Sequence, residues 1–190
     1  GWLFIISLLA YLFFVVFFLS PKVNSYLTDT EMENSKIQFN KVVSIINNKS
    51  RVIENKDDLK KEIELLLTSF TLGKSGHIYI FDSKGKIIFD PSSEFQNVET
   101  SKLIVPNEGK QLLDELKLAY NKKETYAYDW NKVYDPYNYA YQKISWVEYN
   151  QKLDWYIASS IYKEEFSSFI KGINSLILNI SMLLFGVLAI

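Results

Sequence analysis

The sequence predicts an α+β domain held between two membrane-spanning helices. Two uncharged apolar runs, residues 2–19 and 172–190, bracket the 190-residue chain, and all 21 basic and 22 acidic residues lie between them. An uncharged helix of about 18 residues or more can cross a bilayer. Between the runs, helical spacing gives way to segments that alternate with a period of two, which indicates helices and an antiparallel sheet in one domain.

We divide the chain into a membrane helix (1–20), an extracytoplasmic domain (21–169) and a second membrane helix (170–190). The first run is longer than a signal-peptide core, and no small-residue cleavage site follows it, so we prefer a span to a signal peptide. Four polar residues interrupt the second run, for which the alternative is a buried amphipathic helix. We expect a span truncated at the chain end, in a fragment of a larger multi-pass protein of the bacterial inner membrane, with its central domain periplasmic.

Composition excludes several function classes. The net charge of −1 offers no basic field for nucleic acid, and the lack of cysteine excludes disulfides and thiol catalysis. A single histidine and scattered carboxylates predict no metal site, and we find neither a phosphate-cradling glycine loop nor a serine nucleophile elbow. We therefore expect a receptor with no cofactor and no enzymatic activity in this chain.

Two helices are predicted before the sheet. Apolar residues with helical spacing predict a long helix over residues 23–47, which the polar residues 47–50 should break. A second helix is predicted over residues 56–70, with Leu59, Ile63, Leu66 and Leu67 facing inward. Asp57 and Asp58 stand in its first turn, where acidic side chains suit the helix dipole.

The sheet is predicted within residues 77–162 and has about five strands. A hairpin over 77–81 and 86–89 encloses a turn in which Gly85 supplies a positive φ. A loop to residue 109, with a short turn near residues 100–103, leads to a helix over 111–122. Three strands follow, over 125–130, 139–149 and 155–162, with turns at 135–138 and 151–154. Residues 163–170 are expected to be helical and to run into the second span.

Three motifs resemble those of Cache sensor domains of the single-module type. Residues 76–86 (GHIYIFDSKGK) resemble the first hairpin of that family, which ends near a His-Pro or Asp-Pro pair, here Asp90 and Pro91. Residues 143–147 (KISWV) resemble its Lys-x-Ser-Tyr-Val strand, and residues 154–162 (DWYIASSIY) its closing strand. The order and spacing of these motifs span almost the whole segment between the apolar runs.

The resemblance implies a PAS-like sheet, a long N-terminal helix that forms a homodimer, and a small-molecule pocket on one sheet face. Such domains are the sensing heads of chemoreceptors, histidine kinases and diguanylate cyclases, and their ligands are often small carboxylates or amino acids. The chain departs from the family pattern at His77, at Trp146 and at Ala158-Ser159. The first departure bears on the ligand more than on the fold.

Lys143 is the leading candidate for the cation of a small-anion site, which also needs hydroxyl donors and walls that exclude water. It lies mid-strand, in phase with several tyrosines. The alternative is a solvated lysine or one that guards a sheet edge. The candidate ligand-binding residues are Lys143, Tyr126, Tyr128, Trp130, His77, Tyr79, Tyr141 and Phe89.

The other candidates also have structural alternatives. The aromatic stripe at residues 126, 128 and 130 suits a core as well as a pocket wall. His77 could donate to a carboxylate, with pH-dependent binding, or make a buried structural hydrogen bond. Asp129 and Asp154 could bind a ligand amine, but a role in turns or at the surface is the simpler interpretation.

These observations predict a receptor that binds a small carboxylate or amino acid through Lys143. Binding would shift the last strand, residues 155–162, which leads without a linker into the second span. One alternative is a sensor that answers a periplasmic partner protein and binds no small molecule. Another is a membrane-tethered enzyme.

Overall fold

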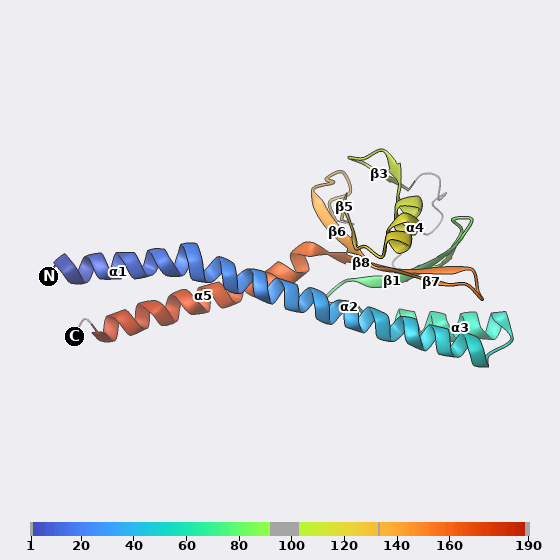
Figure 1. The fold of residues 1–190 in the computed structure, drawn as a ribbon, viewed down its shortest axis with the longest axis horizontal. Coiled ribbons are helices and arrows are strands. Elements are labelled where there is room, and N and C mark those ends of the chain that lie inside the picture. The colour runs from blue at the N-terminus through green and yellow to red at the C-terminus, as the bar shows by residue number, and fades with distance from the viewer. Residues whose placement is uncertain (1, 92–102, 133, 189–190) are drawn as a thin grey trace. The chain divides into compact units, whose positions relative to one another are not determined.

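The computed structural model describes residues 2–91, 103–132 and 134–188 (Figure 1). The chain divides into two compact units, which are considered separately. One unit comprises Gly1–Glu33 and Glu165–Ile190, and the other comprises Asn34–Glu164.

The N-terminal apolar run is helical throughout. Helix α1 (Trp2–Phe14), the π-helical turn η1 (Val15–Leu19) and helix α2 (Ser20–Val52) follow one another without a break. Pro21 has no N–H to donate and its ring crowds the preceding turn, so the widened turn before it keeps the helix continuous. Within that turn the Ser20 N–H donates to the Val15 carbonyl.

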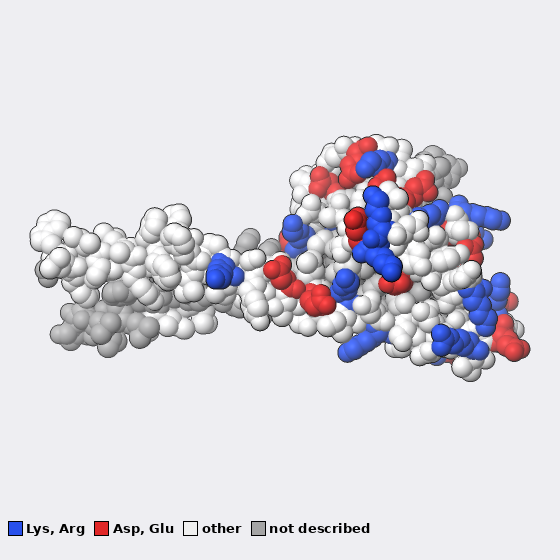
Figure 2. Space-filling view, viewed as in Figure 1, with Lys and Arg blue, Asp and Glu red and all other residues white. Residues whose placement is uncertain are grey.

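In the described part of the chain, one helix, Trp2–Val52, is long and apolar enough to cross a membrane. Residues 172–188 of the second apolar run lie in α5 (Lys163–Leu188), and the assignment of this run as a span stays a prediction. Figure 2 shows charged side chains of both signs over the unit Asn34–Glu164, and fewer on the other unit.

The predicted α+β class with an antiparallel sheet is confirmed. In the described residues the main sheet has six strands in the order β2-β1-β8-β6-β5, with β7 also paired to β8. The strands are β1 (His77–Asp82), β2 (Ile87–Phe89), β5 (Tyr126–Trp130), β6 (Tyr141–Ser145), β7 (Val147–Asn150) and β8 (Trp155–Tyr162). The β1–β2 turn is as predicted, with Gly85 at φ 85°.

Strands β6 and β7 replace the single strand predicted over residues 139–149. Both pair with β8 in one continuous register, since Ile144 lies opposite Ile161 and Val147 opposite Ala158. Between them the Trp146 N–H donates to the Ser159 hydroxyl at 2.7 Å. The Ser159 N–H still donates to the Trp146 carbonyl at 2.9 Å, so a side chain replaces one of the two ladder hydrogen bonds where β6 and β7 are divided.

Residues 34–52 of α2 and helix α3 (Lys56–Thr68) lie on one side of the sheet (Figure 1). We call the sheet surface beneath them the α2 face. It carries isoleucines of β1 and β8, and the helices present buried apolar side chains. These helix residues are Phe39, Val42, Val43, Ile46, Leu59, Ile63 and Leu67.

The predicted helix break at residues 47–50 is wrong, because α2 continues to Val52. The Asn47 side chain and the Ser50 carbonyl of this turn have partners more than a hundred positions along the chain. The Asn150 amide donates to Asn47 Oδ1 at 2.7 Å, and Lys152 Nζ donates to the Ser50 carbonyl at 2.7 Å. These contacts stabilise the last turn of α2.

Helix α4 (Leu112–Lys122) lies on the opposite side of the sheet, which we call the α4 face (Figure 1). A two-stranded hairpin, β3 (Ile104–Val105) and β4 (Lys110–Gln111), precedes it, where the sequence predicted only a loop. The short turn expected near residues 100–103 falls mostly outside the described residues. Tyr79, Phe81 and Tyr128 of the sheet form a buried cluster with Leu112 and Leu116 of α4.

Candidate functional site

The sheet register brings seven of the eight predicted site residues to the α4 face. Residues directly opposite one another on neighbouring strands share a face. Tyr128 lies opposite Lys143 and Trp130 opposite Tyr141, whereas on the other half of the sheet Tyr79 lies opposite Ala158. The seven residues are His77, Tyr79, Tyr126, Tyr128, Trp130, Tyr141 and Lys143.

Phe89 does not belong to this set. Ile87 lies opposite Phe81, but Phe89 lies opposite Ile80, so a bulge leaves Ile88 unpaired between them. Because Ile80 belongs to the α2 face, Phe89 belongs to that face as well. A bulge shifts the alternation by one residue and turns the following side chain to the other face. The expected contribution of Phe89 to a wall beside Tyr79 is therefore corrected.

Lys143 is buried in the middle of the sheet, with 1% of its surface exposed. Strand β6 lies between β5 and β8, so the alternative of a solvated or edge-guarding lysine is excluded. Its ammonium lies 4.7 Å from the ring centre of Tyr162 and 5.9 Å from that of Trp130. The negative faces of these rings favour a cation there, and a buried charge needs such compensation.

Buried hydroxyl groups accompany Lys143 on the α4 face. Tyr128 is 2% exposed, and its oxygen accepts a hydrogen bond of 3.4 Å from the Ser145 hydroxyl. Ser160 lies opposite His77 and is also buried. Within the described residues the Ser160 hydroxyl has no hydrogen-bond partner. Together with Lys143 these groups supply the donors that a carboxylate requires.

His77 stands beside a buried carboxylate that the sequence analysis did not identify as a site residue. Its Nε2 lies 3.8 Å from Asp90 Oδ1, and the two side chains are 15% and 1% exposed. Asp90 directly follows β2 and was interpreted as the end of the hairpin. The pairing of β1 with β2 brings it next to the first residue of β1.

Tyr126 and Tyr141 form hydrogen bonds through their hydroxyl groups at the margins of the site. The Tyr126 hydroxyl donates to Glu108 at 3.5 Å, and burial, together with the nearby carboxylates, raises the pKa of Tyr126 well above its usual range. The Tyr141 hydroxyl donates to Asp135 at 2.7 Å, which raises the pKa of Tyr141 and lowers that of Asp135. Both phenols serve better as ring walls than as ligand donors.

The two carboxylates considered for an amine also hold structural positions. Asp129 accepts a hydrogen bond of 2.8 Å from the Asn107 amide. Asp154, in a left-handed turn position at φ 57°, accepts from the Ser83 hydroxyl at 2.7 Å and the Tyr149 hydroxyl at 2.9 Å. These hydrogen bonds lower the pKa of Asp154. The simpler interpretation of both residues accounts for their contacts.

A second lysine lies close to the site and was missed from the sequence. The Lys132 ammonium lies 4.3, 5.0 and 5.4 Å from the ring centres of Tyr141, Tyr162 and Tyr134, and forms an ion pair with Glu164. The signal was present, because residue 132 continues the alternation of the aromatic stripe. Tyr162, opposite Lys143 at the end of β8, could have been found in the same way.

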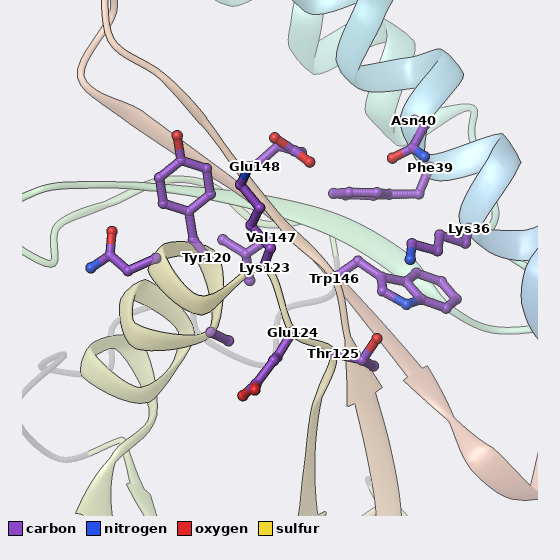
Figure 3. A pocket seen from close by; sticks show the side chains of 12 residues that line it. Lys36, Phe39, Asn40, Tyr120, Lys123, Glu124, Thr125, Trp146, Val147 and Glu148 are labelled. Atoms are coloured by element: carbon purple, nitrogen blue, oxygen red, sulfur yellow. The ribbon is translucent and has the colours of Figure 1, made fainter.

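A groove of about 450 Å³ opens at the edge of β7 (Figure 3). None of the eight predicted residues lines it. Burial raises the pKa of Glu148 in its wall, and Lys36 and Lys123 partly offset this. Its lining residues are Lys36, Phe39, Asn40, Ala119, Tyr120, Asn121, Lys123, Glu124, Thr125, Trp146, Val147 and Glu148. No group of side chains in the described residues is arranged to hold a metal ion.

Comparison with known proteins agrees with this architecture. The model of a Cache domain family matches residues 24–186. No curated protein sequence matches the chain.

Three solved structures share the fold. A methyl-accepting chemotaxis protein from Vibrio parahaemolyticus RIMD 2210633 has 19% identity and a TM-score of 0.60 over 77% of this chain and 98% of its own. A periplasmic sensor domain of a chemotaxis protein has 18% identity and a TM-score of 0.56, covering 68% of this chain and 93% of its own. A Cache chemosensory domain described for carboxylic acid recognition has 14% identity and a TM-score of 0.56, covering 75% and 97%.

Proposed function

The chain belongs to the Cache domain family, and we propose that it is the extracytoplasmic sensor of a bacterial transmembrane receptor and binds a small carboxylate on the α4 face. The observation that carries this proposal is the buried Lys143, held between the rings of Trp130 and Tyr162. A buried ammonium among aromatic rings and hydroxyl groups provides charge, donors and a dry wall for one carboxylate. The related domain described for carboxylic acid recognition supports this ligand class.

The proposed output runs from β8 into α5. Tyr162 ends β8 and Lys163 begins α5, so the chain has no linker there. If a ligand binds one arrangement of β8 more tightly than another, it shifts the equilibrium between the corresponding positions of α5. The free energy of that shift equals the difference in binding free energy. We propose that α5 contains the second membrane span and that the protein is multi-pass in the inner membrane.

We also propose that α2 mediates a homodimer. Ile37 and Ile45 of this helix are 44% and 40% exposed, whereas Phe39, Val42, Val43 and Ile46 of the same helix are buried. Residues eight apart belong to the same stripe of a helix surface. Exposed apolar side chains on one face are typical of a helix that packs against a second copy.

A thermal-shift screen tests the ligand. The full 190-residue chain in detergent micelles is heated with acetate, propionate, pyruvate, succinate or alanine, and the midpoint is read for each. We expect at least one carboxylate to raise the midpoint of the wild type and of K61M, whose lysine lies exposed on α3. The same compound should leave K143M unchanged. Equal shifts in K143M would exclude Lys143 as the ligand cation.

The groove at the β7 edge favours a second candidate function, recognition of a partner protein. An edge strand offers unpaired backbone groups to an added strand, and the groove beside β7 contains charges of both signs. If none of the five compounds shifts the midpoint, and if E148K abolishes signalling in cells without loss of the folded protein, this candidate replaces the first.

A further inference from the structure

We propose that Lys132, Tyr162 and Glu164 form a charge link between the ligand site and the first turn of α5, and that anion binding beside Lys143 weakens the ion pair of Lys132 with Glu164. This inference rests on the proposed function, since it assumes that a carboxylate binds near Lys143. It assigns to the site a second charged pair that sets ligand affinity.

The first observation is that two lysines share one aromatic ring. The Lys143 and Lys132 ammonium groups lie 4.7 and 5.0 Å from the ring centre of Tyr162. The two charges therefore lie within about 10 Å of each other. The Tyr162 hydroxyl donates to the Asn131 carbonyl at 2.6 Å, which holds the ring in place between β8 and the end of β5.

The second observation is the low exposure of both lysines. The Lys132 side chain is 13% exposed and Lys143 as a whole is 1% exposed. Charges separated by protein interact more strongly than charges in water, because the effective dielectric constant is lower. The charge of a ligand carboxylate beside Lys143 will therefore change the energy of the ion pair between Lys132 and Glu164.

The third observation places Glu164 at the start of the output helix. It is the second residue of α5, and its side chain is 48% exposed while it pairs with Lys132. The preceding Lys163 donates to Gln142 Oε1 of β6 at 2.9 Å. Two side chains thus connect the first turn of α5 to β6 and to Lys132 after β5, and one of the two, Glu164, is an acid that can move into solvent.

The sign of the coupling follows from the charges. A bound carboxylate adds negative charge beside Lys143 and repels the Glu164 carboxylate, so the ion pair with Lys132 is weaker in the bound state. Coupling between two sites is reciprocal in free energy. Removing the Glu164 charge should therefore tighten carboxylate binding, whereas removing the Lys132 charge should weaken it.

The test measures affinity in the full 190-residue chain in detergent micelles, by calorimetric titration with acetate, propionate, pyruvate and succinate. For any compound that binds the wild type, we expect E164Q to lower Kd about fivefold and K132M to raise it by a similar factor. E54Q, which removes an exposed acid in the loop before α3, should leave Kd unchanged. The Kd of the double variant K132M/E164Q should lie closer to the wild-type Kd than the Kd of either single variant does.

Amide hydrogen exchange distinguishes the charge link from a purely structural role of Glu164. Saturating propionate, or the tightest binder of the four, should speed exchange in residues 163–166 of the wild type and have no such effect in E164Q. Wild-type binding with an unchanged or weaker affinity in E164Q overturns the charge link alone. No binding of any of the four compounds to the wild type overturns the proposed function, and the charge link with it.

Discussion

The two faces of the sheet differ in what they bury. The α2 face sets Ile78, Ile80, Ile157 and Ile161 against two helices, and each of these isoleucines is completely or almost completely buried. The α4 face buries Lys143, together with tyrosine and serine hydroxyl groups, among its aromatic rings. Apolar burial on one face can supply the stability that polar burial on the other face costs. The comparison therefore separates the residues that hold the fold from those that can bind.

Polar groups do occur on the α2 side, and two of them have hydrogen-bond partners. The buried Ser159 hydroxyl accepts from the Trp146 N–H at 2.7 Å, and Asn150 forms several hydrogen bonds at the rim. Asn150 is 8% exposed, and its side-chain amide donates to Asn47 Oδ1 and to the Ser50 hydroxyl. Its side-chain oxygen, Oδ1, accepts from the Leu153 N–H at 3.0 Å. This arrangement joins the end of α2 to the turn between β7 and β8. It differs from the α4 face, where the buried Ser160 hydroxyl has no hydrogen-bond partner in the described residues.

The largest effect should come from a cavity on the α2 face. Phe39 is 1% exposed, and its ring centre lies 6.2 Å from that of Trp146. We expect F39A to lower the free energy of unfolding by about 3–5 kcal/mol, as for other buried Phe-to-Ala changes. Urea unfolding followed by tryptophan fluorescence measures this. If carboxylate affinity of the remaining folded protein also fell tenfold, the two faces would not be independent.

A smaller loss should follow from opening the rim contact. N150A removes the partner of Asn47 and of the Leu153 N–H. Leaving these part-buried polar atoms unsatisfied should cost about 1 kcal/mol, the lower end of the range for buried groups. N48A, at an exposed position one residue from Asn47, is the matched control. Equal stability of the two variants in urea would show that the Asn150 contacts do not hold the end of α2.

On the α4 face, a substitution should change ligand affinity more than it changes the stability of the fold. Y128F keeps the ring and removes a hydroxyl whose hydrogen bond to Ser145 is long, at 3.4 Å. We expect a change of less than about 1 kcal/mol in unfolding free energy and a several-fold weaker binding of the carboxylate found by thermal shift. A large loss of stability with unchanged affinity would assign Tyr128 to the core.

The smallest effect concerns pH and the turn that joins β7 and β8. Hydrogen bonds from Ser83 and Tyr149 lower the pKa of Asp154 in the folded protein. A carboxyl group with a lowered folded pKa adds stability above its unfolded pKa and loses it as pH falls through the folded value. D154N should therefore lower the melting midpoint slightly at pH 7 and leave it unchanged near pH 2. A constant difference across this range would exclude the ionised carboxylate as the cause.

Local patterns were enough to predict most elements. The alternation in residues 125–130, the turn with Gly85 and the helical spacing of residues 56–70 are short-range features, and each appears in the structure close to its predicted place. The same alternation predicted that Lys143 shares a strand face with Tyr141, because the side-chain period within one strand needs no knowledge of its neighbours. The pairing of β5 with β6 then decided that this face also carries the aromatic stripe.

The sequence by itself therefore determined the class of fold, its family and the composition of each strand face. Only the tertiary structure decided which faces are buried, and against what. The bulge beside Ile88 turned Phe89 away, Asn150 and Lys152 extended α2 past the predicted break, and the return of β8 beside β6 brought Lys132 and Glu164 to the ring that also meets Lys143. Each of these depends on contacts between distant segments, whose register and side-chain partners are set by packing and not by the local pattern.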